Sequence, residues 1–304
     1  MMCFVGQQMV FEDAESMLKA LKGVKINAKQ IERVCHHYGG LIEEQDEDML
    51  ETQVYHSYEQ QESNQLHYAM VDGAMYLTRE EKWKEAKIGR VFKANDNFEI
   101  SDNKRSIITN SMYIAHLGTH KEFFPKFEYY LDGLKSLVII ADGAKWIWNW
   151  ADDFYADATQ VLDFYHAKEH LCDFAVNYFQ EPGQREQWIE QQCQVMLEED
   201  VGKVIEDLKG LPLNPNKKTE KQKQKLIGYY RKNRKRMRYS VFLKRGLLIG
   251  SGAVESAHRH VLQQRMKLSG QHWTKKGFQQ IANLRVVQKS NNWNRIKELT
   301  KKAA

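Results

Sequence analysis

Two aspartates, each followed by a glycine, stand where the sequence predicts core strands. Asp72 lies inside the strand-like stretch Leu66–Thr78, and Asp142 directly follows the apolar run Ser136–Ala141. A carboxylate in or at the end of a buried strand is disfavoured unless a cation compensates its charge. If the two strands are neighbours, these carboxylates face each other, and a hard divalent ion such as Mg²⁺ is the natural compensator. Taken singly, each Asp-Gly pair also fits a turn.

A third carboxylate is needed to hold two metal ions for in-line phosphoryl displacement, and Glu255 is the candidate. It is the only acid in residues 221–297, and it falls in the first turns of a helix that Ser251 can cap. His258 and Arg259 follow on the same helix face, where they could contact the scissile phosphate. The alternative is a surface ion pair between Glu255 and Arg259.

Positive charge is concentrated in the C-terminal third of the chain. Residues 217–304 hold 24 Lys and Arg but three acids, a net charge of +21, whereas the whole chain carries +5. Such a segment favours a polyanion partner, because each neutralised phosphate releases a condensed counterion. A set of solvated basic helices is the alternative. The side chains that we expect to bind the DNA backbone are Lys232, Arg234, Lys235, Arg236, Arg238, Arg265 and Lys267.

The composition is that of an ordinary globular protein, with 42% hydrophobic and 28% charged residues. No run approaches 18 uncharged apolar residues, and the N-terminus lacks the pattern of a signal peptide. We therefore expect a cytoplasmic, nucleoid-associated protein without a membrane segment. The four cysteines (Cys3, Cys35, Cys172 and Cys193) show no CxxC spacing, which argues against a disulfide scaffold and a thiolate zinc site.

The order of the predicted elements indicates an α/β fold. Residues 11–40 predict two short helices, stopped at Gly23 and at Gly39–Gly40, that are similar to a helix-turn-helix hairpin. Three strands, a helix, a strand, a helix and a fifth strand follow, and helices continue from Tyr165 onward. The predicted strands are Leu66–Thr78, Lys84–Lys93, Ser106–Leu117, Ser136–Ala141 and Thr159–Phe164. This order is typical of the ribonuclease-H-like fold, a mixed five-stranded sheet flanked by helices.

Several stretches of the chain match one family in that family's order. The chain resembles DDE transposases of bacterial insertion sequences, of the ISKra type within the Mutator-like group. The matching stretches are VDGAMYLTREEKWKEAKIGRVF, IIADGAKWIWNWADDFY, VLDFYHAKEHL, GSGAVESAHRHVLQQRMKLSGQHWT and ANLRVV, with a weaker match in FEDAESMLKALKGVKINAKQIERV. Their combination is specific, although each stretch alone is not.

The resemblance implies a ribonuclease-H-like core whose metal-binding triad is Asp72, Asp142 and Glu255, with Mg²⁺ as cofactor and Mn²⁺ as a substitute. It also implies that Asp163 and His166 match a Cys/Asp-x-x-His motif that positions the substrate phosphate or supports the acidic site. The expected partners are double-stranded DNA, as terminal repeats and target, and further copies of the chain.

The implied division of the chain has four parts. A helical N-terminal segment (1–64) contains the hairpin, and residues 65–170 form the first part of the catalytic core. A helical insertion (171–247) then precedes the Glu255 helix and the basic C-terminal helices (248–304). Members of this group usually carry a substantial segment ahead of the hairpin, whereas this chain begins almost at it. The alternative function is therefore a truncated remnant that binds DNA without cleaving it.

A second enzyme class must be weighed against the first. His166 to His170 fits H-x-x-E-H, the inverted zinc-peptidase motif, which puts two histidines on one helix face around Glu169. Zinc bound there would need a third protein ligand, for which Glu181, Glu186 or Glu190 could serve. A peptidase explains neither the basic C-terminal third nor the aspartates of the core strands. The transposase interpretation is therefore preferred.

Overall fold

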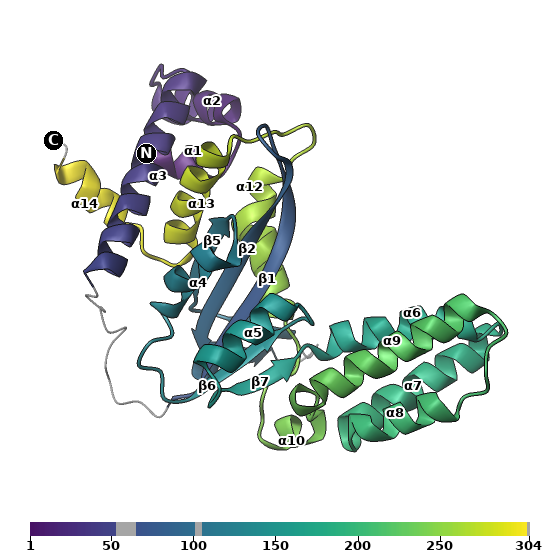
Figure 1. Ribbon diagram of the computed structural model, residues 1–304. Coiled ribbons are helices and arrows are strands. Elements are labelled where there is room, and N and C mark those ends of the chain that lie inside the picture. The colour runs from purple at the N-terminus through teal and green to yellow at the C-terminus, as the bar shows by residue number, and fades with distance from the viewer. Residues whose placement is uncertain (53–64, 101–104, 303–304) are drawn as a thin grey trace. The chain divides into compact units, whose positions relative to one another are not determined.

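The computed structural model describes residues 1–52, 65–100 and 105–302, and the chain divides into two compact units. Unit 1 consists of residues 1–137 and 253–304, and unit 2 of residues 138–252. Figure 1 shows the elements of both. Residues 53–64 of the predicted N-terminal segment lie outside the described residues.

The strands of unit 1 form an antiparallel arrangement around β2. Strand β2 (Lys82–Lys93) pairs with β1 (His67–Thr78) on one side and with β5 (Met112–Leu117) on the other. A separate two-stranded sheet contains β3 (Asn97–Ile100) and β4 (Arg105–Ile108). The prediction of one strand over residues 106–117 is therefore wrong. The chain leaves the ladder at residues 109–111, because β4 pairs with β3 and only β5 pairs with β2.

The first helices of unit 1 include one that is longer than predicted. After α1 (Met2–Gly6) and α2 (Phe11–Lys22), helix α3 runs over Ala28–Glu51 instead of ending at Gly39–Gly40. A Cβ at position 39 would lie 2.1 Å from the backbone oxygen of Gln280 on α13 (Lys275–Lys289). Gly39 therefore permits a close approach between two helices and does not end α3.

The remaining helices of unit 1 either lie between its strands in the sequence or belong to its C-terminal part, which comes after unit 2 in the chain. Helix α4 (His120–Glu128) buries Phe123, Phe124 and Phe127. The short helix η1 (Ala94–Asp96) follows β2. The C-terminal part comprises α11 (Gly252–Ala257), the π-helix η3 (His258–Gln263), α12 (Gln264–Met266), α13 and α14 (Asn294–Lys302).

Unit 2 begins with a parallel pair of strands and continues as helices. Strand β6 (Leu137–Ala141), buried along its whole length, pairs with β7 (Thr159–Leu162), and α5 (Lys145–Phe154) connects them. The helices that follow are α6 (Phe164–Tyr178), α7 (Pro182–Glu198), α8 (Val201–Gly210), α9 (Lys217–Asn233), η2 (Arg234–Arg236) and α10 (Tyr239–Lys244). The predicted change to an all-helical segment near Tyr165 is confirmed.

Five of these seven strands form a mixed sheet in the order β5-β2-β1-β6-β7, and β3 and β4 are not part of it. The predicted α/β class, with a mixed five-stranded sheet and flanking helices, is confirmed. Within residues 1–52, 65–100 and 105–302, no helix is long and apolar enough to span a lipid bilayer.

The contact of Gly39 with α13 gives a stability prediction. Gly39→Ala should destabilise the protein by about 1–3 kcal/mol, because the new methyl group overlaps backbone that cannot move aside. Gly40→Ala is the matched control, because its Cβ would lie 3.2 Å from the mobile end of the Gln280 side chain. This control should be neutral or stabilising by up to about 1 kcal/mol. Urea unfolding of both variants measures the difference, and equal stabilities would contradict the close packing.

Candidate active site

Asp72 lies in the middle of β1, opposite Ile88 of β2. Its side chain is 29% exposed, and its Oδ1 accepts a hydrogen bond from the Gly73 amide at 2.7 Å. A Cβ at position 73 would lie 2.3 Å from Oε1 of Glu85, so the glycine makes room for a neighbouring side chain on β2. The alternative interpretation of Asp72-Gly73 as a turn is wrong, because both residues pair within the ladder.

His258, the first residue of the π-helix, lies against Asp72. Its side chain is 2% exposed, with Nε2 3.5 Å from Asp72 Oδ2 and Nδ1 3.4 Å from the Tyr76 hydroxyl. The Nε2–Oδ2 approach is a close contact without the geometry of a hydrogen bond. Burial lowers the pKa of His258 to about 4 against the opposing effect of Asp72, so the ring is neutral at pH 7. Its position supports Asp72 and keeps the ring away from an external phosphate.

Glu255 is exposed on α11, and α11 is tied to the strands of unit 1. Arg90 of β2 is buried and donates from Nη1 to the Ala253 carbonyl at 2.8 Å. On the other side of Glu255, His258 contacts Asp72 of β1. The structure thus brings Asp72 and the helix that bears Glu255 together within one unit, although they are far apart in the sequence.

The π-helix after α11 depends on a buried arginine of α13. Arg285 donates to the carbonyls of His260 (2.6 Å) and Val261, and also to the Gln7 carbonyl. A π-helix leaves carbonyl groups outside the usual helical pattern, and the guanidinium satisfies two of them. Arg285 therefore stabilises the turn that presents His258 to Asp72.

Asp142 follows β6 and begins the connection to α5 in unit 2. Its Oδ1 accepts from the Ala144 amide at 2.9 Å, and its carbonyl accepts from Trp148 Nε1 at 2.6 Å. Here the turn-type geometry that an Asp-Gly pair favours is present. A Cβ at position 143 would lie 2.4 Å from the Tyr229 hydroxyl, so Gly143 is also required by a close approach from α9.

Asp163 caps α6 and is almost completely buried, with 1% of its surface exposed. Its Oδ1 accepts from the amides of Tyr165 (2.7 Å) and His166, and its Oδ2 accepts from the amide and hydroxyl of Ser251. Ser251, which the sequence suggests as a helix cap, uses its hydroxyl on Asp163 instead. Asp163 thereby anchors the segment directly ahead of α11.

The histidines of the peptidase-like motif share one face of α6. The rings of His166 and His170 lie 4.9 Å apart between centroids, and His166 Nδ1 lies 3.4 Å from Glu169 Oε2. The pKa of His170 is lowered by burial and then by the charge of His166. The three glutamates considered as a further zinc ligand are exposed on or next to α7. The peptidase alternative gains no support from this geometry.

The predicted metal ligands are carboxylates, the donor type that hard cations prefer. Within the described residues, no group of three or more His, Cys, Asp or Glu side chains could hold a metal ion. Asp72, Asp142 and Glu255 are all at least partly accessible carboxylates. Mg²⁺ commonly takes one or two carboxylates together with water and phosphate oxygens, so the donor chemistry fits this ion better than Zn²⁺.

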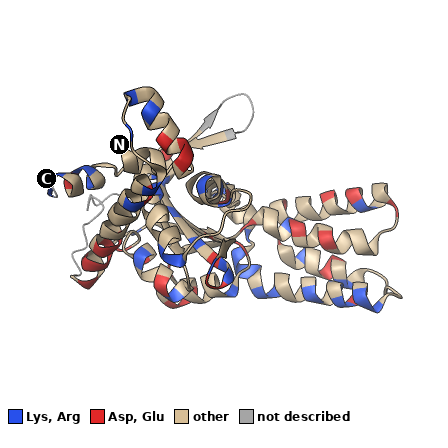
Figure 2. Cartoon of the chain, turned by 90° about the horizontal axis from the view of Figure 1, so that it is seen from above, with Lys and Arg blue, Asp and Glu red and all other residues tan. Residues whose placement is uncertain are grey.

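The predicted DNA-binding cations differ in their availability, and Figure 2 shows the Lys and Arg positions. Arg265 is 1% exposed, donates to the Gly6 carbonyl and lies over the rings of Phe11 and Trp273. Because its guanidinium group is enclosed by protein, Arg265 is not available to bind DNA, and its assignment to the DNA-binding side chains is wrong.

Two further predicted cations have protein partners. Arg236 binds Asp152 at 2.6 Å and stacks on Trp148, and Arg234 pairs with Asp200 at 2.9 Å. Four of the predicted cations are exposed and form no ion pair within the described residues: Lys232, Lys235, Arg238 and Lys267. Arg259 is also exposed.

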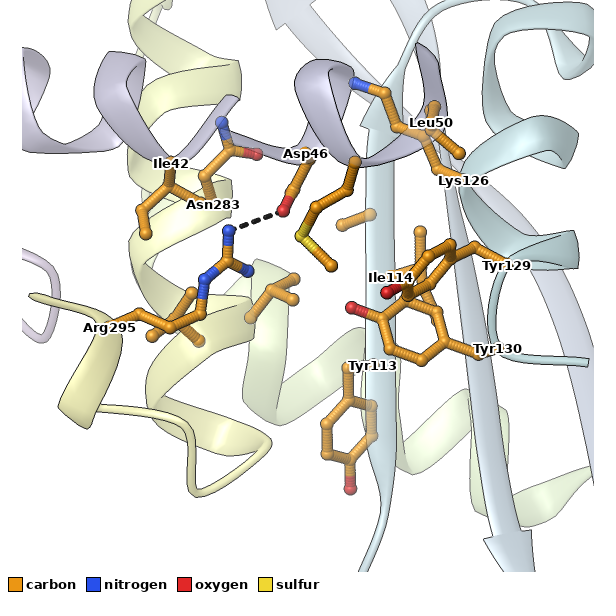
Figure 3. Close-up of a pocket in the computed structure, with 14 residues that line it drawn as sticks. Ile42, Asp46, Leu50, Tyr113, Ile114, Lys126, Tyr129, Tyr130, Asn283 and Arg295 are labelled. Atoms are coloured by element: carbon orange, nitrogen blue, oxygen red, sulfur yellow. Dashed lines mark hydrogen bonds and ion pairs between the residues drawn. The ribbon is translucent and has the colours of Figure 1, made fainter. Parts of the chain in front are cut away.

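A cavity in unit 1 is lined by none of these residues (Figure 3). Its charged groups are paired, with Arg295 Nη2 2.6 Å from Asp46 Oδ1, and burial raises the pKa of Asp46 although Arg295 opposes this effect. Its volume of about 40 Å³ holds only a few water molecules. A nucleotide-sized ligand needs far more space, so this cavity is not the candidate active site.

Three residues that were not predicted from the sequence contact the segments bearing the predicted site residues: Arg90, Tyr229 and Arg285. Arg90 and Arg285 each stand in an apolar stretch, GRVF and ANLRVV, where a charged residue signals a specific buried partner. Tyr229 had no such signal, because its role depends on a glycine 86 positions earlier in the chain.

The model of an uncharacterised protein family, UPF0236, matches residues 47–303. No curated protein matches the chain.

The burial of His258 predicts a pH dependence of stability. Its pKa of about 4 in the folded protein lies below the usual value of 6.5, so only the unfolded chain binds a proton between these limits. Protonation of His258 in the unfolded chain therefore has no effect on the free energy of unfolding above pH 6.5, and it lowers this free energy as the pH falls from 6.5 towards 4. In His258→Gln, the loss of unfolding free energy between pH 6.5 and 4 should be smaller by up to about 3 kcal/mol.

Denaturant unfolding at several pH values measures this effect. His116, whose pKa burial also lowers to about 4, remains in the variant and leaves a residual dependence. Equal pH dependence in the wild type and in His258→Gln would show that His258 is not kept neutral by the fold.

Proposed function

Because the chain belongs to the uncharacterised protein family UPF0236, which is known for transposase-like proteins, we propose that it is a DDE transposase of the ISKra type. In this proposal the sheet and its helices are a ribonuclease-H-like core, and the reaction is metal-dependent cleavage and transfer of DNA strands. The main structural support is the contact of His258 with Asp72, because it places the segment that follows Glu255 next to the strand that bears the first aspartate.

The proposed catalytic groups are Asp72, Asp142 and Glu255, which would hold two Mg²⁺ ions. When bound, the ions supply an activated nucleophile, first water and then a DNA 3′-hydroxyl, and stabilise the leaving oxygen. Neutral His258 supports Asp72 without adding a competing positive charge. Asp163 holds the chain ahead of Glu255 through Ser251, which limits the movement of the segment that leads into α11.

The exposed cations of the C-terminal third would hold the DNA. Lys232, Lys235 and Arg238 follow one another at the end of α9 and beyond it, with Lys267 on the segment after α12. Contacts of this kind go to phosphates and position the duplex without reading its sequence. Two ends of a mobile element need two active sites, so the working form on DNA would contain more than one copy of the chain.

A second candidate is a transposase-derived protein that binds DNA without cleaving it. The two candidates share the basic surface and differ only in the use of the carboxylates. Variants of the carboxylates therefore separate them.

Asp72→Asn and Glu255→Gln should each reduce Mg²⁺-dependent cleavage by at least about 100-fold, because each removes a charged metal ligand. DNA affinity should be nearly unchanged. The substrate is DNA that carries both ends of the element encoding the chain, and the products are separated by denaturing electrophoresis. Glu298→Gln, at an exposed acid of α14 in the same basic region, is the control and should cleave normally. Wild-type activity in Asp72→Asn would remove Asp72 from the site, and DNA binding without cleavage by the wild type would favour the second candidate.

The salt dependence of DNA binding tests the proposed interface. The slope of log K against log salt concentration is negative, and replacing both Lys232 and Lys235 by Ala should reduce its magnitude by about 1.8, because about 0.9 is lost for each phosphate contact. Lys203→Ala is the control, since this lysine of α8 is paired with Glu199 at 2.7 Å. Fluorescence anisotropy with a labelled duplex gives the slopes. An unchanged slope in the double variant would exclude this surface.

A further inference from the structure

Tyr229 of α9 brings a hydroxyl group against the turn that carries Asp142. A Cβ at position 143 would lie 2.4 Å from this hydroxyl, so the phenol occupies the space that Gly143 leaves open. The oxygen has almost no exposed surface and no hydrogen-bond partner among the described residues. A buried hydroxyl without a partner is costly, so it indicates a state of the site in which a partner is present.

The neighbouring residue of the same helix shows the contrast. The hydroxyl of Tyr230 donates to the Ala167 carbonyl of α6 at 2.8 Å and is fully buried. One tyrosine thus uses its hydroxyl to join two helices, whereas the hydroxyl of the other is directed to the Asp142 turn.

The surroundings of Tyr229 keep its hydroxyl protonated and oriented. Its ring lies 4.5 Å from the ring of His170, measured between centroids. Burial, and then the negative charges of Asp142 and Asp163, raise the pKa of Tyr229. Beside a carboxylate, such a hydroxyl acts as a hydrogen-bond donor.

The carboxylate of Asp142 accepts one hydrogen bond from the backbone nearby. Its Oδ1 accepts from the Ala144 amide, which closes the turn at the start of α5. A carboxylate that binds a metal ion is usually held by a second hydrogen bond from an outer group, and that group sets its orientation. Tyr229 is the neutral donor next to this turn.

We propose that Tyr229 is a positioning residue for Asp142, whose carboxylate accepts a hydrogen bond from the Tyr229 hydroxyl when it binds metal. This inference rests on the proposed function, because it assigns Asp142 to a metal ion. Tyr229 stands on α9, a helix that also carries Lys232 at its C-terminal end. The orientation of Asp142 is thereby linked to a helix of the proposed DNA interface.

The test compares Tyr229→Phe with Tyr230→Phe in the full chain, since each variant removes one hydroxyl and keeps the ring. Mn²⁺ binding is measured by calorimetry, together with thermal unfolding and with cleavage of DNA bearing the element's ends. Tyr229→Phe should bind Mn²⁺ about tenfold more weakly. It should cleave normally only at raised Mn²⁺ concentration, with an unchanged or higher Tm. Tyr230→Phe should show a lower Tm and unchanged Mn²⁺ affinity.

The remaining outcomes distinguish a failure of the role of Tyr229 from a failure of the proposed function. Equal Mn²⁺ affinity of Tyr229→Phe and the wild type, in a wild type that binds Mn²⁺ and cleaves DNA, overturns the role of Tyr229 alone. A lower Tm of Tyr229→Phe with unchanged Mn²⁺ affinity assigns the hydroxyl a structural role and also overturns the proposal. A wild type that neither binds Mn²⁺ nor cleaves DNA removes the proposed function and this inference with it.

Discussion

A carboxylate in the middle of a β-strand needs an interaction that compensates its charge. Asp72 of β1 is such a carboxylate, and the neutral ring of His258 lies against it. His258 lies 3.5 Å from Asp72 and is buried deeply enough for its pKa to fall to about 4. A neutral imidazole lies beside the carboxylate without cancelling its negative charge. Together with the hydrogen bond from Arg90 to the Ala253 carbonyl, this contact places the segment that bears Glu255 against the strands of unit 1.

The positive charges of the C-terminal third have two separate uses. Arg265 and Arg285 are buried, and their guanidinium groups are satisfied by backbone carbonyls of α1 and the π-helix and by aromatic rings. Burial lowers the pKa of both to about 10, which still leaves them charged at neutral pH. These cations hold the fold together around the N-terminal helix. The exposed lysines near the end of α9 are the ones left for a polyanion.

Two aspartates at the carboxyl ends of β6 and β7 have opposite environments. Asp163 is buried and accepts four hydrogen bonds, two of them from Ser251, so its oxygens are used by the fold. Asp142 is partly exposed, and its carboxylate closes a single turn through Ala144. The difference in burial and bonding, rather than residue type, separates an anchoring carboxylate from one that can take a ligand. The Tyr229 hydroxyl, which lies next to Gly143, is the donor that we propose for the Asp142 carboxylate.

The amino-acid sequence by itself determined the order of the five sheet strands and of the helices between them, the buried run of β6 and the placement of Asp72, Asp142 and Glu255 on their elements. These features depend on local periodicity and on residues close together in the chain. Only the tertiary structure decided that α3 continues through Gly39, that residues 106–117 form two strands, and that Arg265 is enclosed while Lys232 is exposed. Each of these depends on a partner far along the chain, such as Gln280 against Gly39 or Gly6 with Arg265. Local patterns carry no information about such close approaches, because side-chain packing between distant segments sets them.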